Sequence, residues 1–466
     1  MTRRVWAATV VGWLLGACAP SAVDAPGERL SRAELLDPQV CRACHPTHYE
    51  QWASSMHAYA AEDPVFLAMN QRGQRETGGQ LGEFCVSCHA PMAVREGATS
   101  DGLNLASVSP ELKGITCYFC HNAVSVGDHF NNDIQLADDT TMRAALDAPV
   151  PSPAHDVGYS ALLDTNRRES STLCGSCHDV VVPSGVHLER TLSEYNQSLF
   201  GRLDVGFETC AGCHMPGRKG GRAAELASAP ERVVHEHLWP AVDVALSPFP
   251  GAALQRRAVE CELALNTRIR QIIHDGFGTF TVESETSAGH NQPSGAAQDR
   301  RLWIELIAYD AGDQVIFESG RIGDTEIEGG DAAHDSQLAL YRDWVYRADG
   351  ELTHNFWEVA PSAEHPKGYE ALTLPYATDP NLPHTLRARY VIPRHRELAR
   401  MTVRMRMRPI GMDVLQDLVA TGDLDAATLE RMPTFTLHGA AVEWRPGEPA
   451  PRSLLPADLG CSTAIP

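Results

Sequence analysis

The sequence predicts a multi-domain protein in which an N-terminal part of short helices and loops precedes a C-terminal antiparallel β-sandwich of immunoglobulin-like type. Two observations predict this division. Five copies of a Cys-x-x-Cys-His motif lie between residues 41 and 214, and none lies beyond residue 255. The later part instead contains spaced runs in which apolar and polar residues alternate, as in half-buried strands. With 466 residues, of which 43% are apolar, the chain is long enough for both units.

The N-terminus has the pattern of a bacterial export signal. Arg3 and Arg4 precede an apolar run over residues 5–17 that is too short to span a bilayer. The run leads into Leu15-Gly16-Ala17-Cys18, which is similar to the lipobox of bacterial lipoproteins. This predicts a signal peptide of residues 1–17 and a lipid on Cys18. In the alternative, the signal peptide is an ordinary one and Cys18 is incidental.

A tether is predicted to follow over residues 18–40, because this segment begins rich in Ala, Pro and Ser. We therefore expect an exported, membrane-anchored lipoprotein that faces the periplasm, with the outer membrane and the cell surface left open as locations.

The Cys-x-x-Cys-His motif is the attachment signal of c-type haem. Two thiols three residues apart on a helical turn reach the two vinyl groups of one porphyrin, and the adjacent histidine binds the iron. A single copy would leave a thioredoxin-like redox site, a zinc ribbon or a disulfide framework open, but five strict copies exclude them. We predict a pentahaem cytochrome c domain over residues 41–240 with five covalently bound haem c groups. The thioether cysteines are Cys41, Cys44, Cys85, Cys88, Cys117, Cys120, Cys174, Cys177, Cys210 and Cys213, and the proximal histidines are His45, His89, His121, His178 and His214.

Three cysteines lie outside the motifs. Cys18 is assigned to lipid, which leaves Cys261 and Cys461. These two could form a disulfide in an oxidising compartment or remain separate free thiols, because the sequence does not show whether they are close together.

Fifteen of the 20 histidines remain after the proximal ligands are assigned, enough for a second axial ligand on every iron. Ligation by two histidines gives a low-potential, six-coordinate haem suited to electron transfer, whereas methionine raises the potential. Met56, Met69, Met92 and Met215 lie near the motifs, but we interpret them as core residues.

The first motif begins a longer pattern, in which Cys41–His45 is followed by Tyr49, Trp52, Ser55 and His57. This order resembles the opening signature of the cytochrome c-554/c-prime family, and the resemblance implies that His57 binds a neighbouring haem. The resemblance covers roughly residues 41–240. Also family-like are Cys174–Val180 with Glu189-Arg190-Thr191, and Cys213–Pro216, whereas Tyr195 stands where the family is expected to have Trp.

The same resemblance implies further distal ligands. His155, ahead of the fourth motif, lies where relatives carry a ligand, and His237 matches better than His235 in the segment that leaves the haem domain. His187 completes the distal candidates within this domain. For each of them, the alternative is an ordinary surface or helix-capping histidine.

The C-terminal part, residues 255–450, is predicted to be the β-sandwich. A hairpin is expected from strands 301–309 and 314–318 around an Asp-Ala-Gly-Asp turn. Apolar residues alternate with Arg404, Arg406 and Arg408, which predicts a strand with one face in water. The Gly- and Pro-rich segment 215–232 is predicted to be a loop that closes the haem unit. Further strands are expected at 277–284, 387–392 and 434–445, with a helical insertion at 413–431.

A polar loop, Gly289-His290-Asn291-Gln292-Pro293-Ser294-Gly295, lies at the start of the sandwich. It resembles a Gly-His-x-x-Pro-[Ser/Thr]-Gly loop of β-domains attached to such cytochromes, and the resemblance implies that His290 reaches across to a haem iron. From the residues alone, the loop is a polar Pro-Gly turn.

Electron transfer is the function we favour, because the surplus of histidines can saturate every iron. The partners would be other cytochromes or a membrane quinone oxidoreductase; nucleic acid is not expected at a net charge of −21. One alternative is an oxidoreductase that acts on a small nitrogen or sulfur species at an open haem. Another is that the sandwich binds a partner and the haems act as its sensor. No catalytic residue is assigned, and the sequence contains no Cys-x-x-Cys-Lys motif of the nitrite-reductase type.

Overall fold

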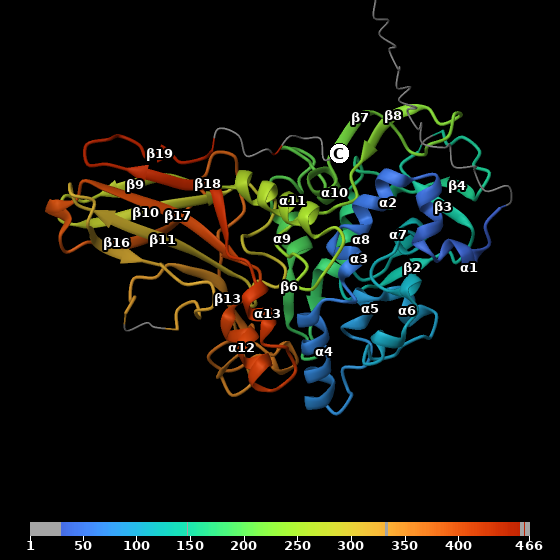
Figure 1. Cartoon of the computed structure of the whole chain (residues 1–466), viewed down its shortest axis with the longest axis horizontal. Coiled ribbons are helices and arrows are strands. Elements are labelled where there is room, and N and C mark those ends of the chain that lie inside the picture. Colours follow the sequence, from blue (N-terminus) through green and yellow to red (C-terminus); the bar gives the residue numbers. More distant parts are fainter. Residues whose placement is uncertain (1–28, 147, 331–333, 457–460, 462–466) are drawn as a thin grey trace, which may run out of the picture.

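The computed structural model describes residues 29–146, 148–330, 334–456 and 461. The predicted signal peptide and Cys18 lie outside these residues. We call residues 29–250 the N-terminal half and residues 251–456 the β half; Figure 1 shows them side by side. Among the helices in the described ranges, none combines the length and the apolar character needed to cross a membrane.

Short helices and two-stranded sheets make up the N-terminal half. The helices are short because caps and prolines delimit them: Asp63 caps the longest one, for example, and Pro64 occupies its first position. The helices are α1 (Arg32–Leu35), α2 (Pro46–Ala53), α3 (Met56–Tyr59), α4 (Pro64–Glu76), α5 (Val86–His89), α6 (Pro91–Arg95), α7 (Cys117–His121), α8 (Arg168–His178), α9 (Thr191–Gln197) and α10 (Cys210–His214). The paired strands are β1 (Ala123–Val126) with β2 (Ile134–Leu136), β3 (Thr141–Ala144) with β4 (Asp156–Tyr159), β5 (Asp179–Val181) with β6 (His187–Arg190), and β7 (Gly217–Arg222) with β8 (Glu231–His235).

Antiparallel sheets make up most of the β half. One sheet has the order β16-β10-β9; the other has the order β14-β13-β11-β17-β18-β19, with β12 paired to β11 and β15 to β13. Apolar side chains of both sheets pack into a single core. The elements are α11 (Ala252–Leu265), β9 (Thr267–His274), β10 (Thr279–Thr286), β11 (Arg301–Tyr309), β12 (Val315–Ser319), β13 (Leu340–Tyr346), β14 (Leu352–Thr353), β15 (Tyr369–Leu372), β16 (Leu386–Val391), β17 (Arg400–Arg408), α12 (Met412–Ala420), α13 (Ala427–Arg431), β18 (Phe435–Trp444) and β19 (Arg452–Ser453).

The short helices and antiparallel strands agree with the predicted fold class. The β11–β12 hairpin is confirmed, and the other predicted strands and the helical insertion lie within a few residues of their expected bounds. The immunoglobulin-like strand order and the domain boundaries stay predictions.

Two local predictions were wrong. Segment 215–232 is not only a loop, because the β7–β8 hairpin begins in it; its many glycines and prolines obscured the strands. The arginine face of β17 is not in water throughout: Arg408 is fully buried, because backbone carbonyls of Gly323 and Glu326 and the carboxylate of Glu328 cover it.

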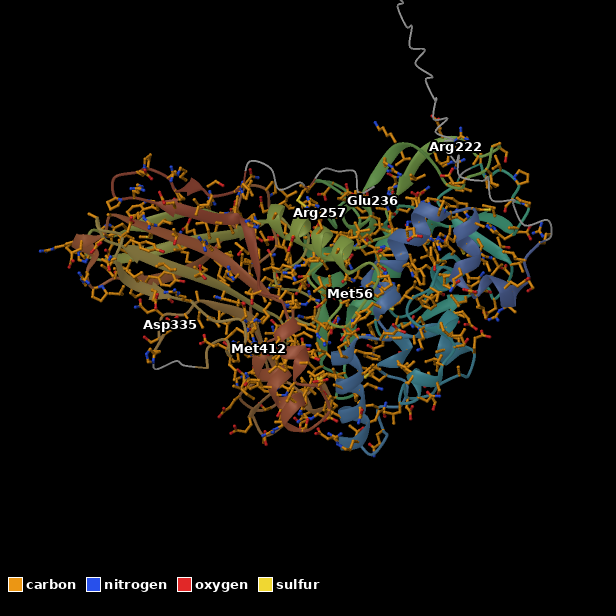
Figure 2. All side chains as sticks on the ribbon, in the orientation of Figure 1. Met56, Arg222, Glu236, Arg257, Asp335 and Met412 are labelled. Carbon is orange, nitrogen blue, oxygen red and sulfur yellow. A yellow bond between two sulfur atoms is a disulfide. The ribbon has the colours of Figure 1, made fainter. Side chains whose placement is uncertain are left out.

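The two halves share apolar contacts. Val65 and Met69 of α4 pack in one cluster with Met412 and Leu415 of α12. Figure 2 shows Met412 near the place where the halves meet. The helical insertion of the β half therefore packs on the N-terminal half.

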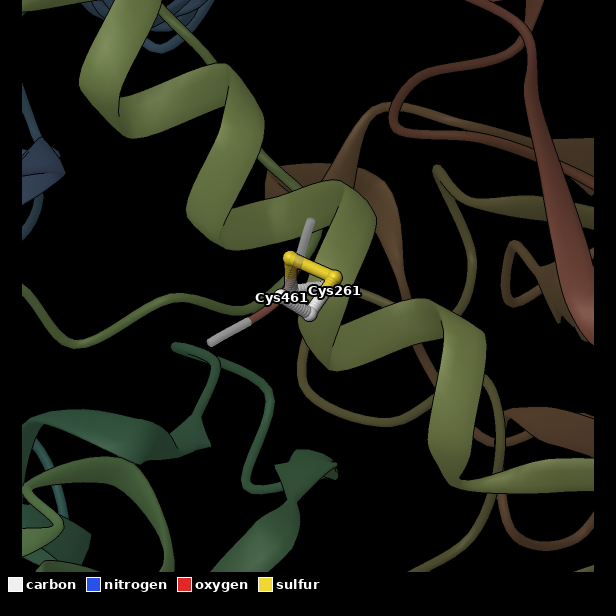
Figure 3. Close-up of a disulfide and its surroundings, with 2 residues drawn as sticks. All are labelled: Cys261 and Cys461. Atoms are coloured by element: carbon white, nitrogen blue, oxygen red, sulfur yellow. A yellow bond between two sulfur atoms is a disulfide. The ribbon is translucent and has the colours of Figure 1, made fainter. Parts of the chain in front are cut away.

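The disulfide that the sequence left open is present. Cys261 of α11 and Cys461 are joined by an S–S bond of 2.05 Å (Figure 3). The disulfide connects residue 461 covalently to α11.

Candidate functional site

The five motifs adopt compact helical turns. The first overlaps a 3-10 helix, Pro38–Ala43, and the others lie in α5, α7, the end of α8 and α10. Thr116 and Thr209 directly precede two of the motifs. Their hydroxyls accept hydrogen bonds from the backbone N–H groups of Phe119 and Gly212, the third residue of each motif. None of the ten motif cysteines is in a disulfide. All five motifs can therefore present two thiols on one side of a turn.

Four of the five motif histidines are oriented through their second ring nitrogen. Nδ1 of His45 donates to the carbonyl oxygen of Ala223 at 2.5 Å, and Nδ1 of His89 donates to that of Ala60 at 3.1 Å. His121 and His214 make the same bond, to Arg143 and Pro240. Because Nδ1 carries the proton, Nε2 of each ring is free to bind a metal.

Four of the motif histidines face a second imidazole. Two imidazoles that bind one metal ion from opposite sides, through bonds of about 2 Å, have ring centres roughly 6 Å apart. The observed separations of 6.3–6.4 Å fit an iron ion between each pair. The pairs are His45–His155 at 6.3 Å, His57–His178 at 6.4 Å, His121–His237 at 6.3 Å and His214–His290 at 6.4 Å.

The partners of three motif histidines are oriented in the same way. Nδ1 of His155, His237 and His290 donates to a nearby backbone carbonyl oxygen at 2.8–2.9 Å. His235, the alternative to His237, instead contacts the carbonyl of Met215 and the hydroxyl of Thr165. The backbone therefore directs the outer nitrogen of these three rings toward the motif histidines.

Burial keeps several of these rings neutral. It lowers the pKa of His57 to about 3 and the pKa values of His178 and His290 to about 4. A neutral imidazole is the form that binds iron, so the protein need not remove a proton from these rings at neutral pH.

His89 has different surroundings. The Phe66 ring lies parallel to the His89 ring, with ring centres 3.9 Å apart. No second imidazole of the described chain lies opposite His89 in the way seen for the other four motifs.

His187 is the distal candidate that the structure does not pair with a motif histidine. Its Nε2 lies 3.1 Å from the carboxylate of Asp179. In the β5–β6 pairing, Asp179 lies opposite Arg190 and His187 lies opposite Val181, so His187 and Asp179 are on neighbouring strands. The ligand role of His187 stays a prediction.

Charged side chains that the sequence did not indicate lie near the second, fourth and fifth motifs. Arg300 donates to Asp243 at 3.0 Å, and burial raises the pKa of Glu189 to about 7. Asp243 interacts electrostatically with His89, and Glu189 does so with Cys88. These residues are far apart along the chain, and Glu189 was noted only as part of a family-like segment.

Cysteines of different motifs lie close together. The Cys117 thiol interacts with that of Cys41 and lowers its pKa, and the Cys177 thiol does the same for Cys88. The first motif is therefore next to the third, and the second is next to the fourth.

Comparisons with known proteins agree with this geometry. The family model of cytochrome c554 and c-prime matches residues 40–122. The fold is similar to that of a penta-heme cytochrome c552 from Thermochromatium tepidum, with a TM-score of 0.59 and 20% sequence identity, over 90% of this chain and 99% of that one. A search of curated proteins found no significant match. The repeated motifs, the imidazole pairs and these two matches identify the chain as a multihaem c-type cytochrome.

Proposed function

We propose that the protein is an exported electron carrier with five covalently bound haem c groups, four of them held between two histidines. The observation that carries this proposal is the set of four imidazole pairs at 6.3–6.4 Å. The ten motif cysteines would hold the porphyrins, and His89 would hold the fifth iron from one side. Haem with two histidine ligands supplies one-electron transfer at low potential. The redox partners would be other cytochromes or a membrane quinone oxidoreductase, and a lipid on Cys18 would anchor the chain.

The cysteine contacts support an order for these groups. The first motif adjoins the third through Cys41 and Cys117, and the fourth adjoins the second through Cys177 and Cys88. Cys174 of the fourth motif also interacts with Cys120 of the third motif and with Cys210 of the fifth. We therefore place the fourth motif at the centre of the five, next to the second, third and fifth motifs.

Mass and spin state test the proposal. The mature holoprotein should exceed its polypeptide mass by five haems of about 0.6 kDa each, and the haems should resist acid-acetone extraction because they are thioether-bonded. Low-temperature EPR of the oxidised protein should show four low-spin haems and one high-spin haem. Five low-spin haems would mean that another side chain closes the iron at His89.

A second function is supported by the surroundings of His89. An iron with one protein ligand can bind a small molecule, and Glu189, with a pKa of about 7, could hold or release a proton near it. Arg300 donates to Asp243 and lies close enough to Glu189 to interact with it electrostatically. This arrangement favours, as a second candidate, an oxidoreductase that acts on a small nitrogen or sulfur species.

Titration with ligands distinguishes the two functions. The reduced intact protein should bind one equivalent of CO, and the oxidised protein should bind one equivalent of cyanide. Nitrite, hydroxylamine and sulfite should then be tested for binding and turnover. Stoichiometric binding with turnover would favour the oxidoreductase, whereas CO binding without turnover of any of them would leave electron transfer as the function.

A further inference from the structure

Glu194 of α9 lies on the boundary between the halves and contacts the loop that carries His290. One carboxylate oxygen accepts the backbone N–H of Asn291 at 3.1 Å and the hydroxyl of Ser294 at 2.7 Å, and the other accepts the side-chain amide of Asn291 at 3.0 Å. Thr191, on the same helix, adds a contact to the Ser294 hydroxyl at 3.0 Å. Both oxygens of the carboxylate are thus used in three hydrogen bonds to two residues that follow His290, namely Asn291 and Ser294.

The carboxylate is connected to the His290 ring through one residue. Nδ1 of His290 donates to the carbonyl oxygen of Asn291 at 2.8 Å, and Asn291 is the residue that Glu194 holds by both its backbone and its side chain. Fixing Asn291 therefore fixes both the position and the rotation of the ring, whose centre is 6.4 Å from that of His214.

Burial of the Glu194 carboxylate is energetically unfavourable unless hydrogen bonds compensate for it, and here these bonds come from the loop. Glu194 is only 7% exposed, and burial raises its pKa. A buried carboxylate is tolerated only when hydrogen bonds compensate for its lost hydration, and all three donors come from the loop after His290. The three hydrogen bonds that stabilise the carboxylate therefore hold one loop of the β half against the N-terminal half.

We propose that Glu194 is a positioning residue that holds His290 as the axial ligand opposite His214. This rests on the proposed function, in which His290 closes the haem of the fifth motif. Without the carboxylate, the β half still covers the site, but the loop loses the three hydrogen bonds that hold Asn291 and Ser294 against α9.

The helix that carries Glu194 has an anchor of its own. Asp179 accepts the backbone N–H groups of Leu192 and Ser193 and the hydroxyl of Ser193, at 2.6–3.2 Å. Since none of these bonds involves Glu194, replacing Glu194 should leave α9 in place. The expected defect is local to the loop.

The experiment compares full-length holoprotein variants by EPR and by the equivalents of CO that the reduced protein binds. His290→Ala should bind one equivalent more than the wild type. Glu194→Ala should raise the population of the same open haem about tenfold or more, since each charge-assisted hydrogen bond lost corresponds to roughly a tenfold change. Glu194→Gln keeps one acceptor oxygen and should recover part of the closed state. Glu169→Ala, at an exposed carboxylate of α8, is the matched control and should behave like the wild type.

The outcomes distinguish the ligand role of His290 from the positioning role of Glu194. If His290→Ala does not open a further haem, the proposed ligation by His290 is wrong. If His290→Ala opens a haem but Glu194→Ala binds CO like the wild type, the positioning role is wrong. If Glu194→Ala opens several haems together, its role is general stability and the inference is overturned. Ser294→Ala removes only one of the three bonds and should open the same haem to a smaller extent; no opening in this variant would also contradict the inference.

Discussion

His57→Ala should convert one low-spin haem into a high-spin haem that binds CO, while the other haems keep their spectra. The reason is the pairing of His57 with His178, at 6.4 Å between ring centres. Removing one imidazole from an iron that has two leaves five-coordinate iron, and its reduction potential should rise because a ligand that stabilises the oxidised form is lost.

The EPR spectrum should identify which haem changes. The ring planes of His57 and His178 are 50° apart, whereas those of the other three pairs differ by 9–27°. Nearly parallel planes separate the iron d orbitals more than crossed planes do, so the His57 haem should give the most anisotropic of the low-spin signals. That signal is the one expected to disappear.

His187→Ala is the matched control, because His187 was also a candidate ligand but contacts Asp179 instead. It should leave the number of low-spin haems unchanged. An unchanged low-spin spectrum in His57→Ala would show that another side chain supplies the ligand to the iron at His178. Loss of a low-spin signal in His187→Ala would instead make His187 a ligand.

The prediction of the attachment residues rests on the sequence alone, because the chemistry is local. The two thiols and the first imidazole of each motif lie within five consecutive residues, so their spacing alone carries the information. The second imidazoles come from elsewhere: His57 faces the fourth motif and His237 the third. Family resemblance selected these histidines, but it could not say which motif each of them faces.

Positions that depend on tertiary contacts could not be predicted. His187 has the same residue type as His155, and only the β5–β6 pairing places it beside Asp179. Glu194 lies beside Tyr195 in a family-like segment, but its partners Asn291 and Ser294 belong to the other half of the molecule, which the segment does not indicate. Alternation in β17 predicted the strand correctly, but it did not show that contacts from residues 323–328 bury one arginine.

Glu328→Ala should destabilise the β half by about 3–5 kcal/mol, the usual cost of removing one partner from a buried ion pair. Arg408 and Glu328 form an ion pair in which both side chains are fully buried. The second carboxylate oxygen of Glu328 also accepts the backbone N–H of Met412 at 3.1 Å, at the start of α12. Removing the carboxylate therefore leaves a buried guanidinium without its counter-charge and a buried N–H without an acceptor.

Urea unfolding followed by far-UV circular dichroism, which reports on the β-sheets, measures this loss as a lower midpoint. Glu318→Ala is the matched control, because its pair with Arg321 is exposed on both sides and should contribute no more than about 1 kcal/mol. The double variant Glu328→Leu, Arg408→Met should recover most of the lost stability, since apolar residues of similar volume often replace a buried pair at little cost. Equal midpoints for Glu328→Ala and Glu318→Ala would show that the buried pair does not hold residues 323–328 and α12 against β17.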